Sequence, residues 1–305
     1  MRRQAWVLVV LVGGCFTTDL DPTKGGVFAC SDEPEGECAD GQDCVNGRCE
    51  ASSELPTVQI GFPEDEQDIG LGVDTPIGGR RTLNITMSGT LDLAPAGDDD
   101  VFGEGHLEVI VDGQEPLIVE SGALSAIVQL DVVLDNTIGA HRISVRAIRN
   151  DGTRYDHAAG SATRLFWISD GVTPLIGIKR PWPGSEFPLE ATPIEVEAAV
   201  LNFALQAANP TGGVADKTGH AHVYYARDIL PCIMDADGCD KQYLTTIVMK
   251  ETPGQLTIPD TVAGSFPISV VLRNINHSLY LFDSTPDDDV DDGVPIVDEV
   301  AVTRR

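Results

Sequence analysis

Two histidines with the spacing of a β-strand are the residues of this chain best suited to metal chemistry. His220 and His222 stand at positions i and i+2 in the segment 219–223 (GHAHV). Alternate side chains of a strand point to one face, so the two imidazoles should lie side by side. Imidazoles bind transition metals when a third ligand approaches, and His277 is the candidate for it. The alternative is that Tyr224, on the same face, packs against both rings.

The densest acidic run suggests a calcium site. Three alternating aspartates are followed by a glycine and a glutamate, namely Asp287, Asp289, Asp291, Gly293 and Glu299. The spacing resembles that of an EF-hand loop, with acidic ligands at positions 1, 3 and 5, Gly at 6 and Glu at 12. One inserted residue, Asp292, displaces the glycine and the glutamate by one position. We expect a weak Ca²⁺ site here, with Ca²⁺ as the cofactor; the alternative is a solvated loop between strands.

Composition and missing motifs exclude several functions. The chain has 305 residues and a formal net charge of −28, which argues against binding to nucleic acid or to anionic lipid surfaces. The motifs G-x-S-x-G, H-E-x-x-H, G-x-x-x-x-G-K-[ST] and C-x-x-C are all absent from the sequence. No nucleophile–base pair is recognisable either, so we expect a protein that is not an enzyme.

The seven cysteines divide into one single residue and two even groups. Cys15 stands alone near the N-terminus. The first group comprises Cys30, Cys38, Cys44 and Cys49, and the second comprises Cys232 and Cys239. Six thiols in two even groups predict complete disulfide pairing in an oxidising compartment, with Cys232 joined to Cys239 and the connectivity of the first group left open. Zinc bound by the first group is the disfavoured alternative, because no C-x₂-C pair occurs there.

The N-terminal residues predict export. A cationic start, MRRQ, precedes the apolar run 5–12 (AWVLVVLV), which is too short to cross ~30 Å of hydrocarbon. The segment 11–15 (LVGGC) resembles the lipobox of bacterial lipoproteins. The resemblance implies lipidation of Cys15, and Phe16 after it implies the outer membrane. The expected location is therefore the cell envelope, with an acyl anchor in the lipid membrane; an ordinary signal peptide is the alternative.

An internal repeat organises the rest of the chain. From Pro56 onward, short segments rich in Val, Ile and Thr alternate with turn residues, which is typical of antiparallel strands. Three landmarks recur in order roughly 114–125 residues later. They are PTVQI at 56–60 and PLIGI at 174–178, GHLEV at 105–109 and GHAHV at 219–223, and GAHRISV at 139–145 and GSFPISV at 264–270. The shared Gly-His favours a role of His106 and His220 in the fold.

These patterns predict an all-β protein with five regions. They are a signal peptide (1–14), a tether (15–29), a Cys-rich segment similar to EGF-like knots (30–50) and two repeats (56–170 and 171–305). The length of the repeats resembles that of tandem Ig-like β-sandwich domains. One stretch within the second repeat, 194–208, has a helix-friendly composition, but its alternating start predicts a strand.

The expected function is that of a lipid-anchored, non-catalytic envelope protein for binding, adhesion or surface scaffolding. Loops displayed by tandem sandwiches are suited to recognition, and the expected partner is another envelope protein or a glycan. The alternative is a metal-handling envelope protein that uses His220, His222 and the acidic loops.

Overall fold

A computed structural model describes residues 38, 42–45, 48–51, 55–72, 75–97, 101–189, 193–209, 211–225, 245–248, 254–257, 263–283 and 293–305. The chain divides into two compact units, Met1–Leu55 and Pro56–Arg305. The described residues form strands, turns and loops, with one 3₁₀ turn at Ala158–Gly160. None of them belongs to a helix long and apolar enough to span a membrane. The predicted all-β fold class is confirmed.

The first unit contains a disulfide-held hairpin. Strand β1 (Gln42–Val45) pairs antiparallel with β2 (Arg48–Ala51). Cys38 is bonded to Cys49, and Cys44 is disulfide-bonded as well. A segment of this length is too short to bury a hydrophobic core. The disulfide bonds therefore stabilise it. A zinc site built from these cysteines is excluded, because an oxidised sulfur is not a thiolate ligand.

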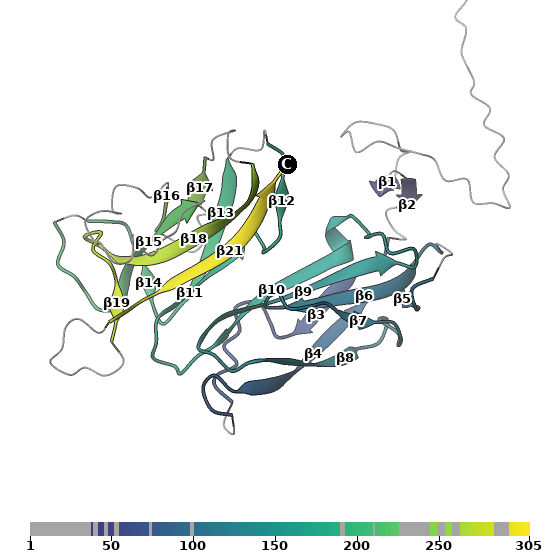
Figure 1. Cartoon of the computed structure of the whole chain (residues 1–305), viewed down its shortest axis with the longest axis horizontal. Coiled ribbons are helices and arrows are strands. Elements are labelled where there is room, and N and C mark those ends of the chain that lie inside the picture. The colour runs from purple at the N-terminus through teal and green to yellow at the C-terminus, as the bar shows by residue number, and fades with distance from the viewer. Residues whose placement is uncertain are drawn as a thin grey trace, which may run out of the picture. The chain divides into compact units, whose positions relative to one another are not determined.

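The second unit begins with a two-sheet β-sandwich (Figure 1). One sheet has the order β3 (Val58–Phe62), β4 (Arg80–Gly89), β8 (Val128–Asp135). The other has the order β10 (Ser161–Ile168), β9 (Gly139–Arg149), β6 (Glu104–Val111), β5 (Asp92–Leu93), with β7 (Leu117–Val119) paired to β6. Their inward side chains form one apolar core that includes Ile85, Leu107, Val145 and Phe166, all fully buried. Alternate residues of each strand therefore fill the space between the sheets.

A second sandwich follows with the same plan. One sheet has the order β11 (Leu175–Arg180), β13 (Ile194–Leu201), β17 (Gly254–Leu256). The other has the order β12 (Glu186–Phe187), β21 (Val297–Arg304), β18 (Gly264–Asn274), β15 (Thr218–Tyr225), β14 (Ala204–Leu205), with β16 (Thr245–Ile247) paired to β15. Strand β19 (Leu281–Phe282) pairs antiparallel with β20 (Val294–Pro295). The stretch 194–208, predicted as a strand, forms β13 up to Leu201 and then the two-residue β14, so the prediction is confirmed for its first half.

The repeated Gly-His pair has a steric explanation in both copies. Gly105 is the second residue of β6 and Gly219 the second residue of β15, and each lies against the neighbouring long strand. A Cβ atom at Gly105 would lie 2.0 Å from the carbonyl oxygen of Ile148, and one at Gly219 would lie 1.8 Å from that of Arg273. Only glycine allows so close a backbone approach. The landmark found in the sequence thus marks a structural requirement shared by the two sandwiches.

The two sandwiches also share apolar and charged contacts. Leu165 and Trp167 of β10 pack with Leu175 and Ala199 of the second sandwich. Beside this cluster, the guanidinium of Arg142 pairs with the carboxylate of Asp298. The ammonium group of a second cation, Lys179, lies 2.8 Å from carboxylate oxygens of both Asp65 and Glu66. Burial of apolar surface and paired charges therefore couple the two domains.

Candidate metal centre

The outward face of β15 carries a row of polar side chains. Ala221 and Val223 point into the apolar core, so His220, His222 and Tyr224 lie on the opposite face of the sheet. Both histidines are nevertheless fully buried. Their neighbour on β18 is Arg273, which pairs in register with His220 and is buried as well. The strand pattern predicted from the sequence therefore places both imidazoles on one face.

His277 reaches this face from the turn that follows β18. Its backbone N–H donates to the carbonyl of Asn274 (3.0 Å), and the Asn274 amide donates to Ser278 Oγ (2.9 Å) and to the Leu279 carbonyl (3.0 Å). His277 has a φ of 71°, in the left-handed region that costs a non-glycine residue about 1–2 kcal/mol. Strain of this kind persists where the surrounding contacts enforce it, as they do in this turn. The turn thus fixes the position of the third imidazole.

Three ring nitrogens converge at this point. His222 Nε2 lies 3.0 Å from His220 Nε2 and 3.1 Å from His277 Nδ1. All three atoms are within 4.8 Å of one another. An imidazole nitrogen has either one proton or one lone pair, so His222 Nε2 cannot make a well-aligned hydrogen bond to both neighbours. A Zn²⁺ ion about 2.0–2.1 Å from each nitrogen would accept all three lone pairs, which is the chemistry of a three-histidine site.

The electrostatics of the cluster favour neutral rings. Burial, followed by the nearby His277 and Arg273, lowers the pKa of His220 to about 4. Burial, followed by His220 and Arg273, lowers the pKa of His222 to about 2. Both rings are therefore uncharged at neutral pH, and only an uncharged imidazole donates a lone pair to a metal. The positive charge of Arg273 opposes a dication, so it would weaken binding.

Tyr224 orients His222. The Arg273 guanidinium donates to Tyr224 Oη (3.2 Å), and His222 Nδ1 lies 3.4 Å from the same oxygen. When His222 Nδ1–H donates to this oxygen, the lone pair of Nε2 faces the other two imidazoles. A hydrogen bond that fixes the tautomer in this way is a common support of histidine ligands. The packing alternative considered for Tyr224 and the metal alternative are therefore compatible.

The buried Nδ1 atom of His220 makes no hydrogen bond within the described part of the chain. A buried polar atom without a partner costs about 1–3 kcal/mol. The buried Nδ1 atom of His106 in the first sandwich also lacks a hydrogen-bond partner among the described residues. This feature is therefore common to both copies of the Gly-His landmark and does not by itself indicate a metal.

Among its described residues, the first sandwich has no such cluster. His106 occupies the position of His220, but Glu108 and Ile110 stand where His222 and Tyr224 stand in the second copy. His106 follows the glycine that both sandwiches need at the start of this strand, so its presence requires no metal. The cluster of three histidines is thus a property of the second copy, and His106 provides a matched control.

Other predicted sites are only partly within the described residues. Glu299 lies on β21, where its carboxylate accepts a hydrogen bond from Ser269 Oγ (2.8 Å). Asp287, Asp289 and Asp291 lie outside the described residues, so calcium binding stays a prediction. The same holds for lipidation of Cys15 and for the pairing of three further cysteines, Cys30, Cys232 and Cys239.

Comparison with known proteins gives a general likeness. No family model and no curated protein matches the chain. Among solved structures, the chain is similar to fibronectin(III)-like modules of CbhA from Clostridium thermocellum, with 13% identity, 81% of this chain and 94% of that chain covered, and a TM-score of 0.23. It is also similar to CBD12 from CALX1.2, with 9% identity, coverage of 81% and 99%, and a TM-score of 0.20. The strand order and cores define the class as a tandem Ig-like β-sandwich protein.

Proposed function

We propose that this chain is an exported, non-catalytic envelope protein whose second β-sandwich binds a transition metal ion of the zinc class. The ligands are His220, His222 and His277. The convergence of their three ring nitrogens within 4.8 Å supports the proposal. The first sandwich and the disulfide-held segment serve as a scaffold that carries this domain on a lipid anchor at Cys15.

The ligand atoms favour zinc over calcium at this cluster. Imidazole nitrogen suits Zn²⁺, Cu²⁺ and Ni²⁺, whereas Ca²⁺ takes oxygen ligands. Three protein ligands leave a fourth position for water or for a side chain of a bound partner. Because the chain has a net charge of −28, it attracts cations to its surface. We propose metal-supported binding or scaffolding as the role, because the sequence contains no recognisable nucleophile–base pair to accompany the metal.

Zn²⁺ is expected to stabilise the second sandwich. A ligand at 100 times its Kd stabilises the folded state by about 2.7 kcal/mol, which raises Tm by roughly 5–10 °C for a protein of this size. Thermal melting with Zn²⁺ or with EDTA measures the shift, and isothermal titration gives the stoichiometry, expected to be one. His277→Ala removes the half-buried ligand and should abolish the shift.

The matched control is His106→Gln, which alters the equivalent position of the first sandwich and should keep the full Zn²⁺ shift. An identical Tm in Zn²⁺ and EDTA would refute the metal site. A full Zn²⁺ shift in the His277→Ala variant would show that the metal binds elsewhere.

The lipid anchor has its own test. If Cys15 carries the lipid, Cys15→Ser should move the protein from the membrane fraction to the soluble fraction of the exporting cell. Cys38→Ser is a suitable control, since it removes a disulfide sulfur and leaves the anchor intact. Membrane association of Cys15→Ser at the level of the parent chain contradicts the assignment.

A further inference from the structure

A second polar row lies on the outward face of the first sandwich. Ile143 and Val145 of β9 point into the core, so Arg142, Ser144 and Arg146 face the other way. In register on β10, Thr163 pairs with Ser144, and Ser161 pairs with Arg146. This is the sheet face that carries the histidines in the second sandwich. It therefore offers a second place for recognition, with different chemistry.

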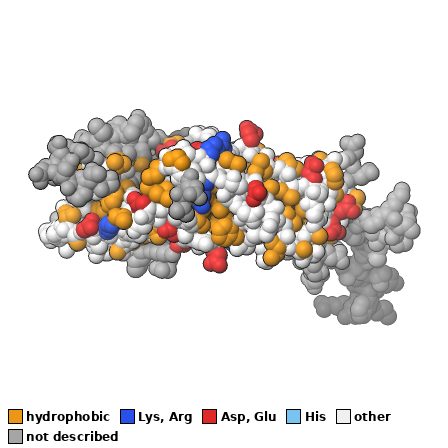
Figure 2. All heavy atoms as spheres, turned by 90° about the horizontal axis from the view of Figure 1, so that it is seen from below, with side chains coloured by type: hydrophobic (Ala, Val, Ile, Leu, Met, Phe, Trp, Pro, Cys, Tyr) orange, Lys and Arg blue, Asp and Glu red, His pale blue; other side chains and the backbone are white. Residues whose placement is uncertain are grey.

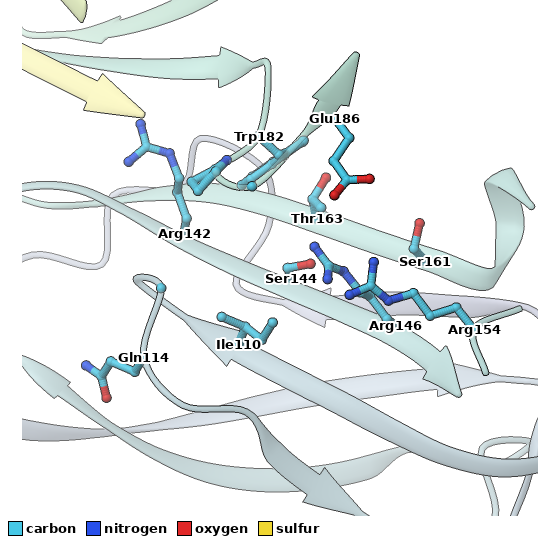
Figure 3. Close-up of a pocket in the computed structure, with 13 residues that line it drawn as sticks. Ile110, Gln114, Arg142, Ser144, Arg146, Arg154, Ser161, Thr163, Trp182 and Glu186 are labelled. Carbon is cyan, nitrogen blue, oxygen red and sulfur yellow. The ribbon is translucent and has the colours of Figure 1, made fainter. Parts of the chain in front are cut away.

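This row forms one wall of a pocket with a volume of about 550 Å³. The opposite wall comes from residues 182–186 at the start of the second sandwich (Figure 3). A volume of this size is within the usual range of small-molecule sites. The side chains that matter for recognition are Ser144, Arg146, Arg154, Ser161, Thr163 and Trp182. They combine cationic, hydroxyl and aromatic groups around one space, which Glu186 also lines (Figure 3); the carboxylate of Glu186 is paired with Arg305.

Two guanidinium groups are placed together in this pocket. Figure 3 shows Arg146 and Arg154 side by side, next to Ser144. Burial and the charge of Arg154 lower the pKa of Arg146, while Glu108 acts in the opposite direction. Arg146 makes no ion pair within 4.0 Å among the described residues. Because both guanidinium groups stay protonated, their combined positive charge attracts a carboxylate that enters the pocket.

The pairing of cations is notable in a chain with 20 basic and 48 acidic residues. On the face shown in Figure 2, the described acidic side chains are scattered over the surface and basic ones are few. The general field of the protein repels anions, but salt screens it beyond about 8 Å at physiological ionic strength. Anion binding in this pocket must therefore depend on short-range contacts with the two arginines.

Trp182 supplies a flat apolar surface in the same pocket. It is half-buried, and it packs against the cluster of Leu165 and Trp167. The apolar face of a sugar ring can stack on such an indole, and serine and threonine hydroxyls can bond to its hydroxyl groups. A carboxylate on the ring can accept paired hydrogen bonds from arginine. An acidic peptide would use the arginines but has less need of the hydroxyl row.

We infer that this pocket binds an acidic saccharide, with a uronate carboxylate against Arg146 and Arg154 and the sugar ring over Trp182. The hydroxyl groups of Ser144 and Thr163 then contact the hydroxyls of the ring. The site shares no residue with the histidine cluster, so it stands independently of the proposed metal function.

Isothermal titration of the full chain with trigalacturonate tests the inference. We expect binding at one site, at least tenfold tighter than that of galactotriose, which has the same ring size but no carboxylate. The double variant Arg146→Gln/Arg154→Gln should weaken binding of trigalacturonate at least tenfold. Trp182→Ala should weaken it at least fivefold, with thermal melting as a check that the variant is folded.

Two controls isolate the site. Arg80→Gln removes an exposed arginine on another sheet and should leave binding unchanged. His277→Ala should also leave it unchanged, so failure of the metal proposal is distinguishable from failure of this one. Absence of trigalacturonate binding overturns the inference, as does full binding by the double arginine variant. Tighter binding of hexaglutamate than of trigalacturonate would overturn it in favour of an acidic peptide.

Discussion

Gly219→Ala is expected to destabilise the second sandwich by at least about 3 kcal/mol. The added methyl group would lie 1.8 Å from the carbonyl oxygen of Arg273, which is backbone of the paired strand. No rotamer change relieves this clash, so β15 and β18 must separate locally and lose hydrogen bonds of their ladder. Because His220 follows directly, the Zn²⁺-induced rise in Tm should also disappear.

Two further glycine variants calibrate this result. Gly105→Ala meets the carbonyl oxygen of Ile148 at 2.0 Å and should destabilise the first sandwich by a similar amount, but keep the response to Zn²⁺. Gly213→Ala meets no atom within 4 Å and should change stability by less than about 0.5 kcal/mol. Urea unfolding measures all three variants. A Gly219→Ala protein within 1 kcal/mol of the parent would show that the strand pair accommodates the methyl group, contrary to this expectation.

Asp298→Ala is expected to cost about 3–5 kcal/mol, the usual loss when one partner of a buried ion pair is removed. The side chains of Arg142 and Asp298 are only 11% and 14% exposed. Asp298 also accepts the backbone N–H of Ile178 (2.6 Å), and Arg142 donates to the carbonyl of Ile178 (3.2 Å). The pair thus connects strands of both sandwiches, and its loss should separate urea unfolding into two transitions.

The comparison variants make this prediction specific. Arg142→Met combined with Asp298→Leu removes both charges and should recover part of the lost stability, because no buried charge is left unpaired but the backbone N–H and carbonyl of Ile178 lose these hydrogen bonds. Arg80→Ala breaks an exposed pair with Asp135 and should cost less than about 1 kcal/mol. If Asp298→Ala lowers the free energy of unfolding by no more than Arg80→Ala does, the Arg142–Asp298 pair does not couple the two sandwiches.

The fold was predictable because its landmarks are local. Alternation of apolar residues identifies strands such as Ile194–Leu201, and glycine before histidine identifies β6 and β15. These signals depend on the period of two and on steric needs of single residues. Their recurrence in the same order is enough to predict two copies of one sandwich.

The candidate sites were predictable only in part. The spacing of His220 and His222 places them on one face, but His277 depends on a turn with a left-handed residue, which no local signal announces. The arginine pocket was not predicted at all. Alternation shows that Arg146 faces outward, but it cannot show that Trp182, from the other sandwich, lies opposite. Contacts between distant strands depend on tertiary packing. The two-residue alternation of apolar side chains shows which face of a strand is buried, but it does not show which strands meet.

Duplication of this sandwich has a consequence for how its chemistry can change over generations. The inward rows of both copies are apolar and interlocked, so a substitution there costs stability. The outward rows lie on the far side of the sheet from that core, and they have already diverged, from Glu108 in one copy to His222 in the other. Selection can therefore alter ligand preference in one domain while the other keeps its own, and neither change requires a new fold.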